Sequence, residues 1–190
     1  MMKKTNLLIG ICLVASCASA FAGDSSLYMG VDAGSVGYRS GTTSNTSTAY
    51  GITGGYQLNK TWGAEAQYMS LGNYSGVATT APNAGKPFTS KCDAFSLVAT
   101  GKYSVADTIS LYGKLGVANS NNNQNHSNGT TGNTARLDAT YGLGAHYDLN
   151  AATGIRFGWD RYIAGNFTTT TSTTGTRNMD VWSLGAVYKF

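Results

Sequence analysis

Cysteine, proline and charged residues are all scarce in this chain of 190 residues, which has 3 Cys, 2 Pro and 12% charged residues. Glutamate occurs once, as Glu65, whereas Thr, Ser, Asn, Gly and Tyr are abundant, so the composition favours strands and turns over helices. Hydrophobic residues still make up 42% of the chain, which excludes a disordered polymer. The length suits one domain with a substantial core and is too short for two.

Positive charge is limited and scattered. The formal net charge is +4, and two of the 13 basic residues are Lys3 and Lys4 at the start of the chain. No basic run or stripe remains in the rest, which argues against a nucleic-acid-binding protein. After residue 23, no stretch approaches the roughly 20 apolar residues of a membrane-spanning helix.

The first segment of the chain has the organisation of a secretory signal peptide. Lys3 and Lys4 form the charged start, Leu7–Ala15 form the apolar stretch, and Ala20-Phe21-Ala22 is a small-x-small cleavage site. We therefore expect a signal peptide over residues 1–22 and one domain over residues 23–190.

An alternative interpretation of the same segment concerns its cysteines. Val14-Ala15-Ser16-Cys17 resembles the lipobox of bacterial lipoproteins, in which the cysteine, here Cys17, is lipidated. If cleavage follows Ala22 instead, Cys12 and Cys17 are removed and Cys92 is left alone in the domain. A single cysteine cannot form an intramolecular disulfide, so export does not imply a disulfide-stapled fold.

A Tyr-polar-apolar triplet recurs along the domain. Its tyrosines are Tyr56, Tyr103, Tyr147 and Tyr188, at separations of 47, 44 and 41 residues. Each ends an alternating run, and the first three lead through short connections into another run. The other connections are longer and rich in Ser, Thr, Asn and Gly; they cover residues 37–48, 71–92, 119–134 and 163–177. This arrangement predicts four up-down strand pairs, with short turns at one end and long loops at the other.

Alternation along each run predicts strands, because successive side chains of a strand face opposite ways. In the sixth run, one face carries Leu137, Ala139, Tyr141, Leu143, Ala145 and Tyr147, and the other carries Arg136, Asp138, Thr140, Gly142, Gly144 and His146. Further strands are predicted near Tyr50–Leu58, Trp62–Ser70, Ala94–Tyr103, Gly154–Tyr162 and Met179–Phe190. The first and fifth runs begin near Leu27 and Ile109.

Two barrels fit this pattern: a soluble lipocalin-like carrier with its apolar face inside, or a membrane barrel with that face toward lipid. The recurring tyrosines at one strand end suit an aromatic girdle at a membrane interface. The polar face carries equal numbers of opposite charges, as a narrow lumen requires. They are Asp32, Glu65, Asp138 and Asp160 against Lys102, Lys114, Arg136 and Arg156. We therefore predict an eight-stranded antiparallel up-and-down transmembrane β-barrel.

Two motifs give a family resemblance. Ser183-x-Gly185-x-x-Tyr188-x-Phe190 resembles the C-terminal signal by which outer-membrane barrels are recognised by the barrel assembly machinery. Gly63-x-Glu65-x-x-Tyr68-x-x-Leu71-Gly72 resembles the second hairpin of the outer-membrane protein A transmembrane-domain family, and similar likenesses extend over most of the domain. The resemblance implies a Gram-negative outer-membrane protein in contact with membrane lipid and lipopolysaccharide.

The same resemblance implies a cluster of opposite charges that blocks the lumen. Glu65 and Arg156 match two members of the family's cluster. His146 stands where the family has a carboxylate, and Thr100 stands where it has a lysine, so the network is altered here. We expect His146 to be a hydrogen-bonding residue of the lumen.

Catalysis is the main alternative, because some eight-stranded outer-membrane barrels modify lipid A. His126 and Ser127 are adjacent, so on a strand they point to opposite faces, and the His-x-Ser spacing of the deacylases is missing. No ligand-type spacing indicates a metal, and no phosphate cradle indicates a nucleotide cofactor. Glycines such as Gly51, Gly54 and Gly55 instead provide room, because bulky side chains cannot fill every inward position.

The expected function is therefore structural or interactive. An eight-stranded barrel has an interior that side chains just fill, which leaves a low-conductance pore as a further alternative. A soluble ligand-carrying barrel is the third alternative. Binding is expected in the long polar loops, with a host or surface ligand as partner. We expect no catalytic residue, no metal and no cofactor.

Overall fold

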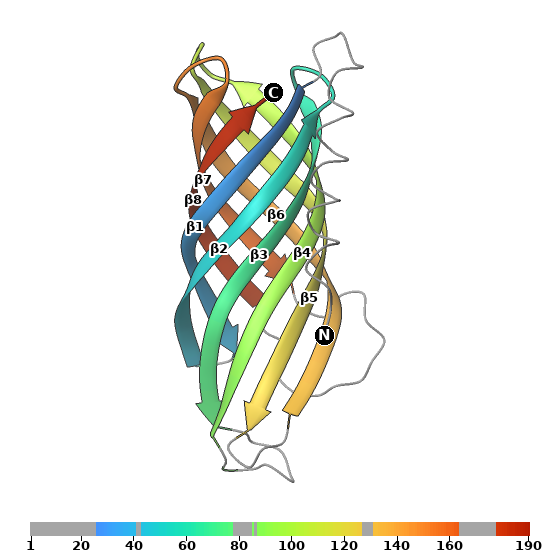
Figure 1. The fold of residues 1–190 in the computed structure, drawn as a ribbon, viewed down its shortest axis with the longest axis vertical. Helices are drawn as coiled ribbons and strands as arrows, with labels where there is room; N and C mark the ends of the chain where they lie inside the picture. Colours follow the sequence, from blue (N-terminus) through green and yellow to red (C-terminus); the bar gives the residue numbers. More distant parts are fainter. Residues whose placement is uncertain (1–25, 41–42, 78–84, 86, 127–130, 164–177) are drawn as a thin grey trace, which may run out of the picture.

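The computed structural model describes residues 26–40, 43–77, 85, 87–126, 131–163 and 178–190. They form the eight β-strands coloured along the sequence in Figure 1. The strands are Ser26–Ser40 (β1), Thr43–Gln57 (β2), Trp62–Val77 (β3), Pro87–Ser104 (β4), Ile109–His126 (β5), Thr131–Asp148 (β6), Thr153–Ile163 (β7) and Asn178–Lys189 (β8). Over the same ranges, no helix has the length and apolarity needed to span a membrane.

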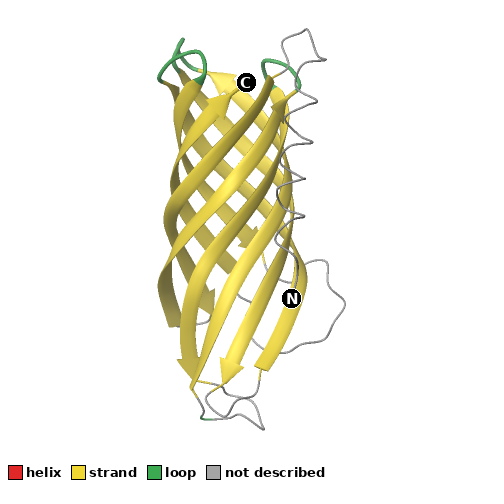
Figure 2. Ribbon diagram, viewed as in Figure 1, coloured by secondary structure: helices red, strands yellow, loops and turns green. Residues whose placement is uncertain are grey.

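The sheet closes on itself. Each strand pairs antiparallel with the next, and β8 pairs with β1 in a register that sets Leu184 opposite Ala33 (Figures 1 and 2). Closure leaves no free sheet edge among the eight strands. The structure thus confirms the predicted eight-stranded antiparallel up-and-down barrel.

Three short turns lie together at one end of the barrel, which we call the turn end (green loops, Figure 2). Two of them have asparagine as their second residue, Asn59 and Asn150. The Oδ1 atom of Asn59 accepts hydrogen bonds from the backbone N–H groups of Thr61 and Trp62 at 2.9 and 2.8 Å. Asn150 bonds Ala152 and Thr153 in the same way. These side-chain-to-backbone bonds fix the tight reversals.

The apolar faces of the strands point outward. Leu143 and Leu184 are 63% and 59% exposed, whereas Glu65 and Arg156 are 7% and 4% exposed. This distribution excludes a soluble carrier with an apolar cavity, because such a barrel would bury the leucines and hydrate the charges.

Several strands are longer than predicted. Residues 119–126 and 131–134 were expected to be loop, yet they continue β5 and β6, and Asn121 pairs with Ala135 across the hairpin. Parts of the expected loops at 37–48 and 71–92 are likewise strand. Polar side chains on both faces erase the alternation signal, but backbone pairing does not need it. Residues 164–177 of the fourth expected loop lie outside the described part.

A β-bulge in β3 interrupts its regular pairing with β4. The pairing of β3 with β4 shifts between Ser70 and Asn73. Gly72 lies in the shift with a φ of 73°, and a Cβ there would overlap Ser47 and Thr48. Glycine is required at this position because other residues rarely adopt that conformation.

Gly54 and Gly55 in β2 have opposite surroundings. A Cβ on Gly55 would overlap the inward-pointing ring of Tyr28, so this glycine provides the room that was predicted. A Cβ on Gly54 would meet nothing within 4 Å, and the residue is exposed on the outer face. The prediction that Gly54 makes space in the interior is therefore wrong, because only one of two consecutive strand residues faces inward.

This neighbouring pair gives a matched test of interior packing. We expect Gly55→Val to destabilise the barrel by about 1–3 kcal/mol, because the added methyl groups force the Tyr28 ring from its place. Gly54→Val should leave stability unchanged or raise it slightly, since valine favours strands. Urea unfolding in lipid vesicles, followed by tryptophan fluorescence, measures both. Equal losses for the two variants would contradict the packing assigned to Gly55.

Candidate functional site in the barrel interior

The interior changes character along the barrel axis. Along β1, the inward residues from the turn end are Tyr28, Gly30, Asp32, Gly34, Val36 and Tyr38. Tyr28 borders an open cavity, Asp32 belongs to a cluster of charges, and Val36 lies in an apolar layer. Side chains from other strands join Tyr28, Asp32 and Val36 at these three levels.

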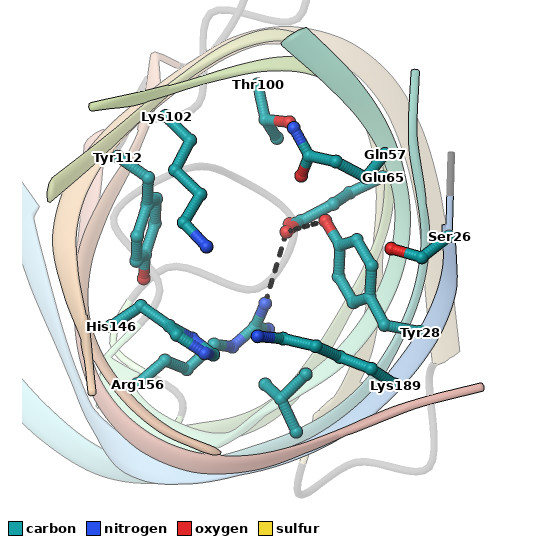
Figure 3. Close-up of a pocket in the computed structure, with 11 residues that line it drawn as sticks. Ser26, Tyr28, Gln57, Glu65, Thr100, Lys102, Tyr112, His146, Arg156 and Lys189 are labelled. Atoms are coloured by element: carbon teal, nitrogen blue, oxygen red, sulfur yellow. Dashed lines mark hydrogen bonds and ion pairs between the residues drawn. The ribbon is translucent and has the colours of Figure 1, made fainter. Parts of the chain in front are cut away.

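Arg156 of β7 is the centre of the charge cluster. It is bound to Asp32 of β1 through two contacts, Nε to Oδ1 at 2.8 Å and Nη2 to Oδ2 at 2.5 Å. Its Nη1 atom lies 3.3 Å from Oε1 of Glu65, and Nη2 also donates to Thr53 at 2.6 Å. The hydroxyl of Tyr28 donates to the same Glu65 oxygen at 2.7 Å (Figure 3). One guanidinium is therefore shared by two buried carboxylates.

Two further ion pairs lie farther from the turn end. Lys114 and Asp160 approach to 2.8 Å, and their side chains are only 3% and 6% exposed. Arg136 lies 3.7 Å from Asp138, with the arginine side chain 24% exposed and the aspartate fully buried. Buried charges of this kind are stable only when a partner offsets their lost hydration.

At the turn end, Asp148 contacts both His146 and Lys189. Nε2 of His146 lies 2.9 Å from Oδ1 of Asp148, and Nζ of Lys189 contacts the same oxygen. Lys102 lies at the same level and points into the cavity (Figure 3). Asp148 and Lys189 are absent from the predicted set of lumen charges. Their alternation with the outward Tyr147 and Tyr188 would have placed them inside.

The half of the interior remote from the turn end contains a layer of buried apolar side chains. Its members are Val36, Tyr38, Ala49, Met69, Leu71, Cys92, Ala94, Ala118, Tyr162, Met179 and Val181. Sγ of Cys92 lies 3.8 Å from Sδ of Met179 within it. Side-chain alternation in the predicted strands did not reveal this apolar layer. At this level apolar side chains pack together in the bore, beside the Arg136–Asp138 pair of β6.

A cavity of about 140 Å³ occupies the turn end of the interior. Its half-exposed rim includes Ser26, Gln57, Lys102 and Lys189, and the buried Glu65 and Arg156 lie deeper. The remaining lining residues are Tyr28, Thr100, Tyr112, His146 and Val187 (Figure 3). The cavity therefore ends on the charge cluster.

The remaining predicted residues lie on the outer surface or beside the cluster. Tyr103, Tyr147 and Tyr188 are 72%, 49% and 50% exposed near the turn end, and Tyr56 is half-buried there. In the C-terminal motif, Tyr188 meets the ring of Phe190 edge-on at 5.1 Å between centroids. Ser183 faces inward, and a Cβ on Gly185 would overlap Asp32.

Aromatic side chains also form a patch midway along the outer surface. Trp159 and Trp182 lie with ring centroids 6.3 Å apart, Phe157 stacks on Trp182 at 5.7 Å, and Tyr141 meets Trp159 edge-on at 5.7 Å. Such large exposed aromatic surface on β6, β7 and β8 is suited to contact with hydrocarbon rather than water.

The described residues present no arrangement for nucleophilic catalysis. The one hydrogen bond of the His146 side chain within this part of the chain goes to Asp148, and no hydroxyl or thiol bonds the ring. The side chain of His126 lies outside the described residues. No group of three or more His, Cys, Asp or Glu that could hold a metal ion occurs in the described ranges.

A closed barrel with an apolar outer surface and paired charges inside defines the transmembrane β-barrels of the outer membrane. The chain belongs to the outer membrane protein beta-barrel domain family, whose family model matches residues 8–190. Both findings confirm the family resemblance and the expectation of a Gram-negative envelope protein.

Among curated proteins, the chain is 27% identical over 188 residues to outer membrane protein P5 of Haemophilus influenzae. The match covers 82% of this chain and 50% of that protein, so the chain spans about half the length of this relative.

Several solved structures share the fold. Neisserial surface protein A has a TM-score of 0.69 at 15% identity, with 89% of this chain and 100% of that chain covered. Ail of Yersinia pestis, crystallised with the heparin analogue sucrose octasulfate, has a TM-score of 0.58 at 16% identity, with 90% and 100% covered. The N-terminal β-barrel domain of Pseudomonas aeruginosa OprF has 0.53 at 18%, with 86% and 97% covered. At these identities the likeness concerns the fold.

Removal of Arg156 tests the charge cluster. We expect Arg156→Ala to destabilise the barrel by about 3–5 kcal/mol, because Asp32 and Glu65 are left buried without their cation. The control is Arg161→Ala, which breaks the more exposed pair with Asp180 and should cost about 0–1 kcal/mol. Urea unfolding in lipid vesicles compares them. Similar midpoints for the two variants would refute the central role of Arg156.

The Lys114–Asp160 pair allows a double-mutant test. Lys114→Met and Asp160→Asn should each cost about 3–5 kcal/mol, because each leaves one buried charge without its partner. The double variant should recover most of that loss, since it removes both charges. The same unfolding measurement provides the coupling energy. Additive losses would show that the two groups do not interact as an ion pair.

Proposed function

We propose that the protein is an exported, closed outer-membrane barrel that provides an envelope scaffold and a surface for contacts outside the cell. Residues 1–22 would direct export, with cleavage after Ala22. The turn end would face the periplasm, because outer-membrane barrels have their short turns on that side. In this orientation Tyr56, Tyr103, Tyr147 and Tyr188 would form the periplasmic aromatic girdle. Ser183, Gly185, Tyr188 and Phe190 would serve as the assembly signal.

The observation that carries this proposal is the filled interior beneath an apolar exterior. The outer surface suits lipid, and the bore is occupied first by the Arg156 cluster and then by the apolar layer. These two levels support a plugged lumen over a permanent pore. The absence of an activated nucleophile among the described residues supports a role other than lipid A modification.

The end opposite the turns supports a contact role. There β5 and β6 continue as a hairpin with exposed, uncharged residues, including Asn121, Asn123, Asn125 and Asn133. Amide side chains both donate and accept hydrogen bonds, so they suit polyhydroxylated partners such as surface polysaccharide or host glycans. Ail, which shares the fold, was crystallised with a heparin analogue.

The plugged lumen is tested by conductance. In planar lipid bilayers, we expect the purified barrel to show no stable open level, because the apolar layer blocks water and ions. A barrel of larger strand number provides the positive control for insertion. A steady conductance from folded protein, identified by the shift of its gel mobility on heating, would rule out the closed lumen.

The contact role is tested by shortening the β5–β6 hairpin. Replacing residues 122–134 by Asn-Gly keeps Asn121 opposite Ala135 and supplies a two-residue turn. Cells producing this variant should lose adhesion to host cells, whereas the amount of heat-modifiable barrel in the outer membrane should not change. If adhesion persists in this variant and in cells lacking the gene, the protein is not an adhesin.

A further inference from the structure

The cavity at the turn end contains charged groups that the plug does not use. It is open at a half-exposed rim and closed at its base by Glu65 and Arg156. Beyond the base, the Lys114–Asp160 pair and the apolar layer occupy the bore. The cavity is therefore a blind cup that receives molecules only from the side of the turns, and its use does not depend on the surface role proposed above.

Lys102 supplies an uncompensated positive charge. Its side chain is half-buried and points into the cavity (Figure 3), and it forms no ion pair within the described residues. The charges that act on it are those of Lys189 and Asp148. Asp148, however, is already bound to Lys189 and His146. The Lys102 ammonium therefore lacks an anion of its own.

Glu65 supplies the complementary negative charge. Oε1 accepts the hydrogen bonds from both Tyr28 and Arg156, whereas Oε2 has no hydrogen-bond partner among the described residues. The side chain is 7% exposed. Arg156 is also shared with Asp32, so two carboxylates face one guanidinium and an excess negative charge remains at the base of the cup. A buried carboxylate oxygen without a donor is costly.

We propose that this cup binds a small zwitterion of the α-amino acid type. Its carboxylate would pair with Lys102 near the rim, and its ammonium would lie against the Glu65 carboxylate at the base. The ligand's carboxylate would meet an ammonium that has no anion of its own, and its ammonium would meet the excess negative charge at the base. Neither a simple anion nor a simple cation satisfies both groups.

The size of the cup limits the ligand. Its volume of about 140 Å³ is close to the roughly 150 Å³ of a cavity that admits one benzene molecule. Alanine has the same number of heavy atoms as benzene, whereas tryptophan has more than twice as many. The rings of Tyr28 and Tyr112 and the methyl groups of Val187 line the sides, so a short side chain fits and a large one does not.

The test uses the membrane-inserted protein in phospholipid nanodiscs, titrated with L-alanine, acetate, methylammonium and L-tryptophan and followed by amide NMR shifts. We expect saturable shifts around the cup with L-alanine, at least about tenfold weaker binding of acetate and methylammonium, and no saturation with L-tryptophan. A tenfold change corresponds to about 1.4 kcal/mol.

Variants identify the groups. Lys102→Met should weaken L-alanine binding at least about tenfold, whereas Lys60→Met, which removes an exposed lysine in a turn, should leave it unchanged. Glu65→Gln should weaken L-alanine binding but not acetate binding. Heat-shifted gel mobility verifies folding, and Lys102→Gln replaces Lys102→Met if the latter fails to fold.

Three results would overturn the proposal. They are no saturable L-alanine binding, acetate binding as tight as that of L-alanine, and L-alanine binding that is indifferent to Lys102. The second result would define an anion site in place of a zwitterion site.

Discussion

The narrow bore of an eight-stranded barrel is the constraint on which the rest of this structure depends. Charges buried within it are removed from bulk water, so each needs a partner in the interior. Arg156 binds Asp32 and Glu65, and Lys114 binds Asp160. The same narrowness accounts for the inward glycines, such as Gly55, which leave room for large side chains from neighbouring strands. The lipid outside and the limited space inside thus together restrict which side chains each strand can carry on its two faces.

The barrel interior combines two kinds of packing along one axis. Near the turns, a hydrogen-bonded charge cluster lies at the base of the cup, and farther from the turns apolar side chains form a layer. Ionised groups and close-packed apolar groups both exclude continuous water, but only the former leave polar atoms able to bind a solute. A blind polar cup at one end and an asparagine-rich hairpin at the other give the two ends different chemistry.

Much of the fold could be predicted from side-chain alternation and from the spacing of Tyr56, Tyr103, Tyr147 and Tyr188. Both are local properties, and the pleat converts them directly into an inner and an outer face. The strand ends remote from the turns could not be predicted, because residues such as Asn119–Asn125 are polar on both faces and carry no alternation. Their pairing depends on backbone bonds to the neighbouring strand, which composition does not encode.

The sequence by itself determined the class of barrel and the number of strands. These follow from short-range periodicity and from the rule that an ionised group avoids lipid. Tertiary structure alone decided which charges meet. Arg156 lies 124 positions from Asp32, and their contact exists because closure of the sheet sets the register of β7 against β8 and of β8 against β1. The apolar layer and the cup arise in the same way, since inward side chains from different strands converge at levels that only the closed register defines.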